Sequence, residues 1–250
     1  MRALLATSQI TYVPDNYAPL FKELLPKHAH QIKGIILLQN LNFSVVTKAL
    51  GLYAMGARRT GRGFLHNILK ASVRLDPREE LARKFNIPIY KFESMNCDKA
   101  LQLVKNLEID VVVNMRTRCI YKRPILEAPR LGCLNIHHGL LPEYRGTLCD
   151  LYALSQGRPA GFSIHHMVEK VDAGVLYKRC EVSQGDKNYQ EYLKRSAGAE
   201  AKALSEIFSY VEKEGRLPEP LAISSSTPHH YSKTPNKNQI RAMIDQGLIL

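Results

Sequence analysis

The stretch NIHHGLLPEYRG, residues 135–146, decides the fold assignment because it places polar side chains where a strand is expected to end. Asn135 and His137 are two residues apart, so their side chains point to the same side of an extended segment. Asp172 follows 37 residues after Asn135, beyond a predicted helix and a predicted strand. That interval is long enough for the chain to return and bring the Asp172 carboxylate to the His137 imidazole. The three residues are therefore predicted to share one site.

The segments around this stretch alternate between strand and helix patterns. Strands are expected at 2–6, 32–38, 87–90, 109–113, 133–136, 162–167 and 175–182. Helices are expected at 17–25, 76–85, 97–107, 148–155 and 239–246, with a long helix from about 193 that ends at Gly215. This order predicts an α/β fold, a Rossmann-like open and mainly parallel sheet with helices on both faces. Ligands of such sheets bind past the carboxyl ends of the strands, where Asn135 and His137 lie.

The chain of 250 residues suits one catalytic domain, expected over 1–216, followed by a short irregular tail or small appendage over 217–250. Residues 40–75 are expected to form short helices joined by a mobile loop. Within this region, seventeen residues without an acid carry the cations Arg58, Arg59, Arg62, Lys70 and Arg74. Such a basic cluster attracts nucleic acids, nucleotides or other phosphates, and a solvated helix face is the alternative.

Composition narrows the class of protein further. The five cysteines are scattered and form no Cys-x-x-Cys pair, so neither a disulfide framework nor a zinc ribbon is expected, and a cytoplasmic location fits best. No run of 18 apolar residues is present and the N-terminus reads as a strand, so no membrane segment or signal peptide is expected. The pairs His137-His138 and His165-His166 place adjacent side chains on opposite faces of strands. No metal site is therefore expected.

An Asn, a His and an Asp can perform acyl transfer without a protein nucleophile. His and Asn donors can stabilise the oxyanion of a carbonyl under attack, and one such donor typically lowers the barrier by roughly 3–4 kcal/mol. The Asp can orient the His and accept protons through water, and such general acid–base help contributes about 10²–10⁴ in rate. The attacking group would come from the substrate, for instance an amine. A satisfied Asn and His at a strand end is the alternative for these residues taken alone.

Over residues 109–182 the sequence resembles the formyltransferase family that uses 10-formyltetrahydrofolate. The family pattern is Asn-x-His-x-x-Leu-Leu-Pro-x-Tyr-Arg-Gly, then Gly-x-x-x-His-x-Met/Val, then Asp-x-Gly. The matching residues are Asn135, His137, Leu140, Leu141, Pro142, Tyr144, Arg145, Gly146, Gly161, His165, Met167, Asp172 and Gly174. Two positions depart from the pattern: His138 stands where the family usually has proline, and residues 146–149 lack a proline often found there.

The resemblance implies roles for particular residues. Asn135, His137 and Asp172 would form the catalytic trio, and 10-formyltetrahydrofolate would be the co-substrate, with no metal. The pterin ring would lie in a slot between two segments, which contribute Arg116, Thr117, Arg118, Cys119 and Ile120 on one side and Val168, Glu169, Lys170 and Val171 on the other. The acceptor would meet the loop formed by Leu140, Leu141, Pro142, Tyr144, Arg145 and Gly146.

The acceptor stays open at this point. A small amine such as a nucleotide-linked amino sugar fits a single catalytic domain, and the basic cluster would meet its diphosphate. Methionyl-tRNA is the alternative: a basic Gly/Arg-rich insert at 56–63 favours it, but the 35 residues after Gly215 are too few for the β-barrel domain of that branch. Hydrolysis of 10-formyltetrahydrofolate is a third reading. Residues 7–12 contain no glycine, which argues against the phosphate loop of the glycinamide ribonucleotide branch. Outside the family, a pI of about 9.5 fits a nucleic-acid-binding module.

Overall fold

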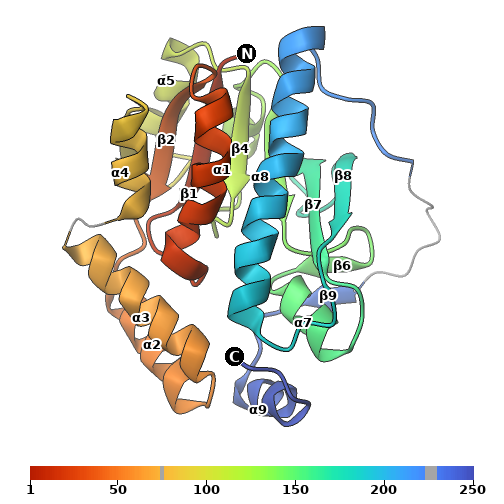
Figure 1. Ribbon diagram of the computed structural model, residues 1–250. Helices are drawn as coiled ribbons and strands as arrows, with labels where there is room; N and C mark the ends of the chain where they lie inside the picture. The colour runs from red at the N-terminus through yellow and green to blue at the C-terminus, as the bar shows by residue number, and fades with distance from the viewer. Residues whose placement is uncertain (74–75, 223–229) are drawn as a thin grey trace.

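A seven-stranded sheet runs through the computed structural model, which describes residues 1–73, 76–222 and 230–250. Its strand order is β3-β2-β1-β4-β5-β7-β8 (Figure 1). The strands are β1 Ala3–Ser8, β2 Ile32–Leu38, β3 Ile89–Phe92, β4 Val111–Met115, β5 Cys133–His137, β7 Gly161–His166 and β8 Leu176–Glu181. The first five in this order pair in parallel, and β7 and β8 add antiparallel strands at one edge. The predicted mainly parallel α/β sheet is confirmed.

Both faces of the sheet are covered because its central strands direct apolar side chains to both faces. In β1, Ala3 and Leu5 face one hydrophobic cluster, whereas Leu4 and Ala6 face another. The first cluster contains residues of α1 (Ala18–His28), α4 (Pro77–Lys84) and α8 (Tyr189–Glu214). The second contains residues of α5 (Asp98–Asn106) and α6 (Arg123–Leu126). Figure 1 shows α1 and α8 side by side over the sheet.

The ends of two helices follow from capping chemistry; the start of α4 at Asp76 and the end of α8 at Gly215 were expected, whereas the Asn188 cap was not. The Asp76 side chain accepts a hydrogen bond from the Arg78 backbone N–H at the start of α4. The Asn188 side chain accepts bonds from the N–H groups of Gln190 and Glu191 at the start of α8. Gly215 ends α8 in the left-handed conformation, with φ of 70°. Both ends of helix α8 are therefore defined by local hydrogen bonds and backbone conformation.

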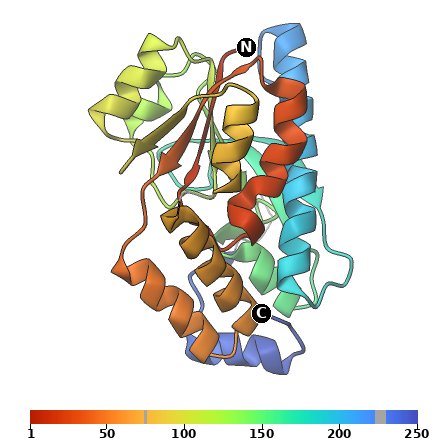
Figure 2. The ribbon, with the colours of Figure 1, turned by 60° about the vertical axis from the view of Figure 1, so that its left-hand side comes forward.

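Residues 43–72 form a helical hairpin: the expected helices are present, and only residues 55–57 join them where a loop was expected. Helices α2 (Phe43–Ala54) and α3 (Arg58–Ser72) pack side by side (Figure 2). Gly61 permits this close approach, since a Cβ there would lie 2.7 Å from the Tyr53 backbone nitrogen. Packing of the two helices overrides the low helix propensity of their glycines. Four of the five basic-cluster residues lie on α3, and Arg74 lies outside the described residues.

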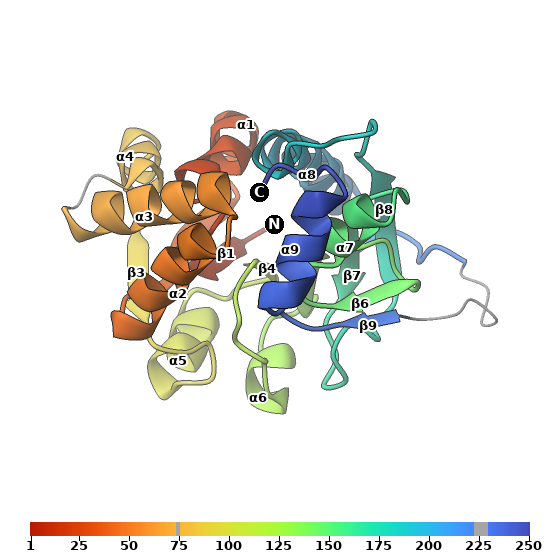
Figure 3. The ribbon, with the colours of Figure 1, turned by 90° about the horizontal axis from the view of Figure 1, so that it is seen from below.

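The C-terminal region is more regular than expected. Strand β9 (His230–Ser232) pairs in parallel with β6 (Tyr144–Gly146), which lies inside the 135–146 stretch. Helix α9 (Lys237–Asp245) follows, close to the predicted 239–246, and begins with a capping box formed by Asn236 and Gln239. Figure 3 shows β9 beside β6, with α9 next to them. The boundary placed at residue 216 stays a prediction.

Two further short elements complete the described chain. A 3₁₀ turn, η1 (Pro14–Tyr17), precedes α1, and helix α7 (Cys149–Ser155) follows β6. None of the helices described is both long enough and apolar enough to cross a membrane. The cytoplasmic location stays a prediction.

Candidate active site

The register of the sheet brings polar residues of three strands into one row. Asn114 on β4 stands opposite Asn135 on β5, and Asn135 stands opposite His165 on β7. The Asn114 amide donates to Asn135 Oδ1 at 2.8 Å, and Asn135 Nδ2 lies 3.0 Å from His165 Nε2. The row crosses the carboxyl-end region of β4 and β5, where a ligand crevice is expected.

His137 is held between a carboxylate and a backbone carbonyl. Its Nε2 donates to the Tyr144 carbonyl oxygen at 2.8 Å, and its Nδ1 lies 3.4 Å from Asp172 Oδ1. The other carboxylate oxygen of Asp172 accepts from the Gly146 N–H at 2.9 Å. Because both ring nitrogens face oxygen acceptors, the site suits an imidazolium that donates in both directions. Strand β6 thus supplies the backbone groups that orient both His137 and Asp172.

A pocket of about 440 Å³ opens beside this group. Asn135, His137 and Asp172 all line it, so the structure brings the predicted trio together. The two predicted slot segments form its walls, with the exception of Lys170, which is not among the lining residues. The walls are Arg116, Thr117, Arg118, Cys119 and Ile120 on one side and Val168, Glu169 and Val171 on the other.

Apolar side chains stand exposed on both walls. Ile120 is 67% exposed on one wall, and Val168 and Val171 are 44% and 46% exposed on the other. Exposed aliphatic side chains on both segments that line the pocket suit a flat ring, because a bound ring would remove them from water. Asn114 and Thr117 add hydrogen-bonding groups at the base of this slot.

The Arg116 side chain turns inward from the slot. Its φ of 58° is left-handed, and the guanidinium lies over the rings of Tyr12 and Tyr17, at 5.6 and 5.3 Å from their centroids. It donates to the Tyr12 hydroxyl at 2.9 Å, contacts His138 Nδ1 and lies 3.6 Å from Glu200. Arg116 therefore belongs to a buried polar cluster under the pocket floor.

The ionisation of this cluster is governed by burial. Burial, together with the neighbouring Arg116 charge, holds the pKa of His138 well below its ordinary value. Burial alone raises the pKa of Glu200 well above its ordinary value. Burial also raises the pKa of Asp150, which accepts a hydrogen bond from the Tyr189 hydroxyl. The cluster therefore combines a permanent cation with a neutral imidazole and two carboxyl groups that resist ionisation.

Most predicted acceptor residues shape the loop rather than line the pocket. Leu140, Leu141 and Tyr144 are buried, and the Leu141–Pro142 peptide bond is cis. Of the six predicted residues only Gly146 lines the pocket, and the neighbouring lining residues are Thr147, Leu148 and Thr234.

Nine pocket residues besides His165 were given no role from the sequence: Tyr12, Asn114, Tyr121, Ile136, His138, Thr147, Leu148, Met167 and Thr234. His165 matched the family pattern but was also given no role. Asn114 ends a β-branched strand, so its position was a signal, but its pairing with Asn135 depends on the register. Thr234 reaches the pocket only because β9 pairs with β6, and no sequence signal announces that pairing. Across the ranges 1–73, 76–222 and 230–250, no group of three or more His, Cys, Asp or Glu could hold a metal ion.

Comparison with known proteins identifies relatives of this arrangement. Residues 68–208, more than half of the chain, match the formyl transferase family model. A methionyl-tRNA formyltransferase of Kosmotoga olearia is 30% identical over 138 residues, which are 54% of this chain and 44% of that protein. A methionyl-tRNA formyltransferase of Pseudoalteromonas translucida is 33% identical over 148 residues, which are 58% of this chain and 44% of that protein. The matches thus span less than half the length of these relatives.

Solved structures share the fold at low sequence identity. A phosphoribosylglycinamide formyltransferase from Anaplasma phagocytophilum has a TM-score of 0.60 at 14% identity and covers 93% of this chain and 99% of its own. A sugar N-formyltransferase from Shewanella sp FDAARGOS_354 has a TM-score of 0.58 at 13% identity and covers 98% of this chain and 88% of its own. These likenesses establish the fold alone. With the family-model match, the conclusion is that this chain belongs to the formyl transferase family.

Proposed function

We propose that this protein transfers a formyl group from 10-formyltetrahydrofolate to a primary amine of a small, phosphate-bearing acceptor, such as a nucleotide-linked amino sugar. One observation carries the proposal: His137 lies between Asp172 and a backbone carbonyl, beside Asn135, at the base of a slot with apolar side chains on both walls. The slot suits the pterin ring, and the polar row would lie next to the formyl group.

In this proposal the reaction proceeds by direct attack. The amine nitrogen of the acceptor forms a bond to the formyl carbon, and the carbonyl oxygen takes up negative charge. An N–H of Asn135 donates to that oxyanion. Both His137 N–H groups face the Tyr144 carbonyl and Asp172, so the protonated His137 ring would stabilise the oxyanion through its positive charge. Asp172 receives the proton that the amine loses, through water, and the folate N10 is protonated as its bond to the formyl carbon breaks. The products are a formamide and tetrahydrofolate, with no change of oxidation state.

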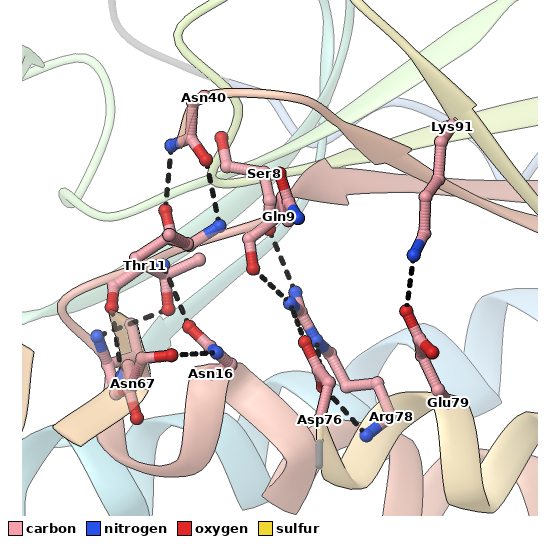
Figure 4. A network of polar contacts seen from close by, with 12 residues as sticks. Ser8, Gln9, Thr11, Asn16, Asn40, Asn67, Asp76, Arg78, Glu79 and Lys91 are labelled. Carbon is pink, nitrogen blue, oxygen red and sulfur yellow. Dashed lines mark hydrogen bonds and ion pairs between the residues drawn. The ribbon is translucent and has the colours of Figure 1, made fainter. Parts of the chain in front are cut away.

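The loop after β1 argues against one class of acceptor. Its backbone N–H groups are already bonded within the protein: Gln9 donates to the Leu38 carbonyl, Ile10 to Asn40 Oδ1 and Thr11 to Asn16 Oδ1. Figure 4 shows Asn40 and Asn16 holding this loop. These groups cannot also cradle a phosphate, so a glycinamide ribonucleotide bound through this loop is disfavoured. In this proposal Arg118, which is exposed and lines the pocket, would meet an acceptor phosphate.

Methionyl-tRNA is the second candidate acceptor. Arg58, Arg59 and Arg62 lie exposed on α3, and the two relatives described above are methionyl-tRNA formyltransferases. An exposed arginine row suits a phosphate backbone. If this reading holds, replacing the three arginines by alanine lowers kcat/KM for methionyl-tRNA, most strongly at low salt, and leaves transfer to small amines unchanged.

The test is tetrahydrofolate release from 10-formyltetrahydrofolate in the presence of nucleotide-linked 3- and 4-amino sugars, methionyl-tRNA, glycinamide ribonucleotide or no acceptor. Release with one amine identifies the acceptor, whereas release without any acceptor indicates hydrolysis. The variants Asn135→Ala, His137→Gln and Asp172→Asn should each lose at least about 10²-fold in kcat. His166→Gln, which changes a histidine outside the pocket lining, is the matched control. No release with any acceptor, together with no binding of a folate analogue, would refute the proposal.

A further inference from the structure

We infer that Asn114 is a positioning residue for formyl transfer: it fixes which end of the Asn135 amide faces the reacting carbonyl. The inference rests on the proposed function. Asn114 lies outside the 135–146 stretch, on β4, and only 6% of it is exposed. Its amide lies between the hydroxyl groups of the slot wall and Asn135, so it connects the slot to the predicted oxyanion donor.

The hydrogen bonds around Asn114 run in one direction. The hydroxyl groups of Thr117 and Tyr121 donate to Asn114 Oδ1 at 2.6 and 3.4 Å. Asn114 Nδ2 in turn donates to Asn135 Oδ1 at 2.8 Å. The Asn135 oxygen is therefore occupied on the side of β4, and its nitrogen faces β7.

The hydrogen bonds of His165, on the other side of Asn135, fix the same direction independently. His165 Nδ1 lies 2.8 Å from the His166 carbonyl oxygen, which can only accept, so Nδ1 carries the proton. Burial, together with the neighbouring His137, lowers the pKa of His165 to about 4, which leaves Nε2 as an acceptor at neutral pH. The Asn135 group that faces Nε2 at 3.0 Å must then be the donor nitrogen. Both ends require the same orientation of the Asn135 amide.

This orientation determines what Asn135 offers to the pocket. One hydrogen of Asn135 Nδ2 is used by His165, and the other is left for a ligand in the pocket that Asn135 lines. A flipped amide would instead present its carbonyl oxygen to a developing oxyanion, and the two negative partial charges would repel. Asn114 thus decides between stabilisation and repulsion without contacting the substrate's formyl group.

The variant that tests this most sharply is Asn114→Asp. A carboxylate of the same shape cannot donate, so Asn135 must turn its nitrogen toward Asp and its oxygen toward His165. We expect kcat to fall by about 10²–10³, the usual cost of one oxyanion donor, with KM for 10-formyltetrahydrofolate within about twofold of wild type. His165 should change its protonated nitrogen from Nδ1 to Nε2, which ¹⁵N NMR of the histidine rings detects. A purely structural role for Asn114 would not move that signal.

Two further variants grade the effect. Asn114→Ala removes the donor without forcing the flip, so kcat should fall by about tenfold, in line with the loss of one orienting hydrogen bond, and His165 should keep its Nδ1 proton. Tyr121→Phe removes only the long bond at 3.4 Å and should have a smaller effect than Asn114→Ala. Asn106→Asp, an exposed change on α5, is the matched control and should behave like wild type.

The outcomes separate this inference from the proposed function. If wild type transfers no formyl group, the proposed function fails, and the His165 ¹⁵N signals in wild type and Asn114→Asp still test the orientation. Unchanged His165 protonation in Asn114→Asp, together with a kcat within about twofold of wild type in both Asn114 variants, would overturn the inference. If Asn114→Asp does not fold, as judged by circular dichroism, the kcat of Asn114→Ala decides: a fall of about tenfold supports the inference, and a value within about twofold of wild type overturns it.

Discussion

Arg78 and Arg116 both place their guanidinium groups inside the fold, and they are held differently. The Arg78 side chain is fully buried, forms an ion pair with Asp76 at 2.6 Å and donates to the Ser8 and Gln9 carbonyls (Figure 4). The Arg116 side chain is 3% exposed, and its carboxylate neighbour, Glu200, lies 3.6 Å away. Its other neighbours are aromatic rings and the His138 imidazole.

The surroundings differ in how completely polar groups are paired. Arg78 lies among acceptors that match its donors, and it holds the loop after β1 in place. Around Arg116, several buried polar atoms have no protein partner within the described ranges: Arg116 Nε, His138 Nε2, Asp150 Oδ2 and Glu200 Oε2. Incomplete pairing costs stability and is retained where function requires the groups. Arginine thus stabilises the fold at position 78, whereas at position 116 it sets the electrostatics of a pocket.

The largest expected effect is on the Arg78 side. Arg78→Met leaves the Asp76 carboxylate buried and unpaired, so the free energy of unfolding should fall by about 3–5 kcal/mol in urea denaturation. Arg123→Met is the control, because the Arg123–Glu127 pair is exposed, and it should cost at most about 0.5 kcal/mol. A loss below about 1 kcal/mol for Arg78→Met would contradict the view that Arg78 stabilises the fold.

The next largest effect is the contribution of His165, which lines the pocket, to the pH dependence of stability. The pKa of His165 is about 4 in the folded protein and ordinarily 6.5, so between these values the unfolded chain binds a proton that the folded chain does not. Stability should therefore fall as the pH is lowered from 7 to 4, by up to about 3 kcal/mol from this residue. Unfolding free energies measured across this range should show a shallower decline in His165→Gln. Parallel curves for the variant and wild type would contradict the assignment.

Arg116→Met should separate stability from activity. Glu200, whose pKa is raised by burial, can take up a proton when the arginine is removed, so no buried carboxylate is left charged. We expect a loss of about 1–2 kcal/mol in unfolding free energy, clearly less than for Arg78→Met. The value of kcat/KM should fall at least about tenfold, since Arg116 lines the pocket and holds His138. Equal losses of unfolding free energy in Arg78→Met and Arg116→Met would show that both arginines stabilise the fold to the same extent.

The smallest effect is expected for Glu200→Gln. Because burial raises the folded-state pKa of Glu200 above the ordinary 4.5, the unfolded chain releases this proton at a lower pH than the folded chain. Wild-type stability from this group is therefore present below pH 4.5 and declines as the pH rises above it. Gln does not ionise, so the stability of the variant relative to wild type should grow from pH 4.5 to 8. A difference that is flat over this range would show that Glu200 is ionised in the fold.

Local chemistry explains which features could be predicted from the sequence. The β-branched run at 109–113, the Asp76 cap and Gly215 mark their elements by themselves, and the spacing of Asn135 and His137 predicts a shared face. Helices were expected within residues 40–75, but the hairpin of α2 and α3 could not be predicted, because glycine disfavours helices and Gly61 is explained only by the packing of α3 on α2. The three-residue strand β9 is too short to give a pattern. The row from Asn114 to His165 depends on strand register, which the sequence does not reveal. The inward turn of Arg116 depends on its left-handed backbone conformation, which the sequence does not reveal either.

The pairing of β9 with β6 also sets the earliest point during translation at which the pocket can be completed. Ser232 contacts Cys149, 83 residues earlier in the chain, and its hydroxyl donates to the Thr147 carbonyl at 2.7 Å. During translation the trio and the slot segments leave the ribosome long before β9 and Thr234 do. A nascent chain can therefore form the central sheet early, whereas the part of the pocket lined by Thr234 must wait for a contact between segments far apart in the chain, and such contacts form slowly. The pocket is thus completed only after β9 has left the ribosome.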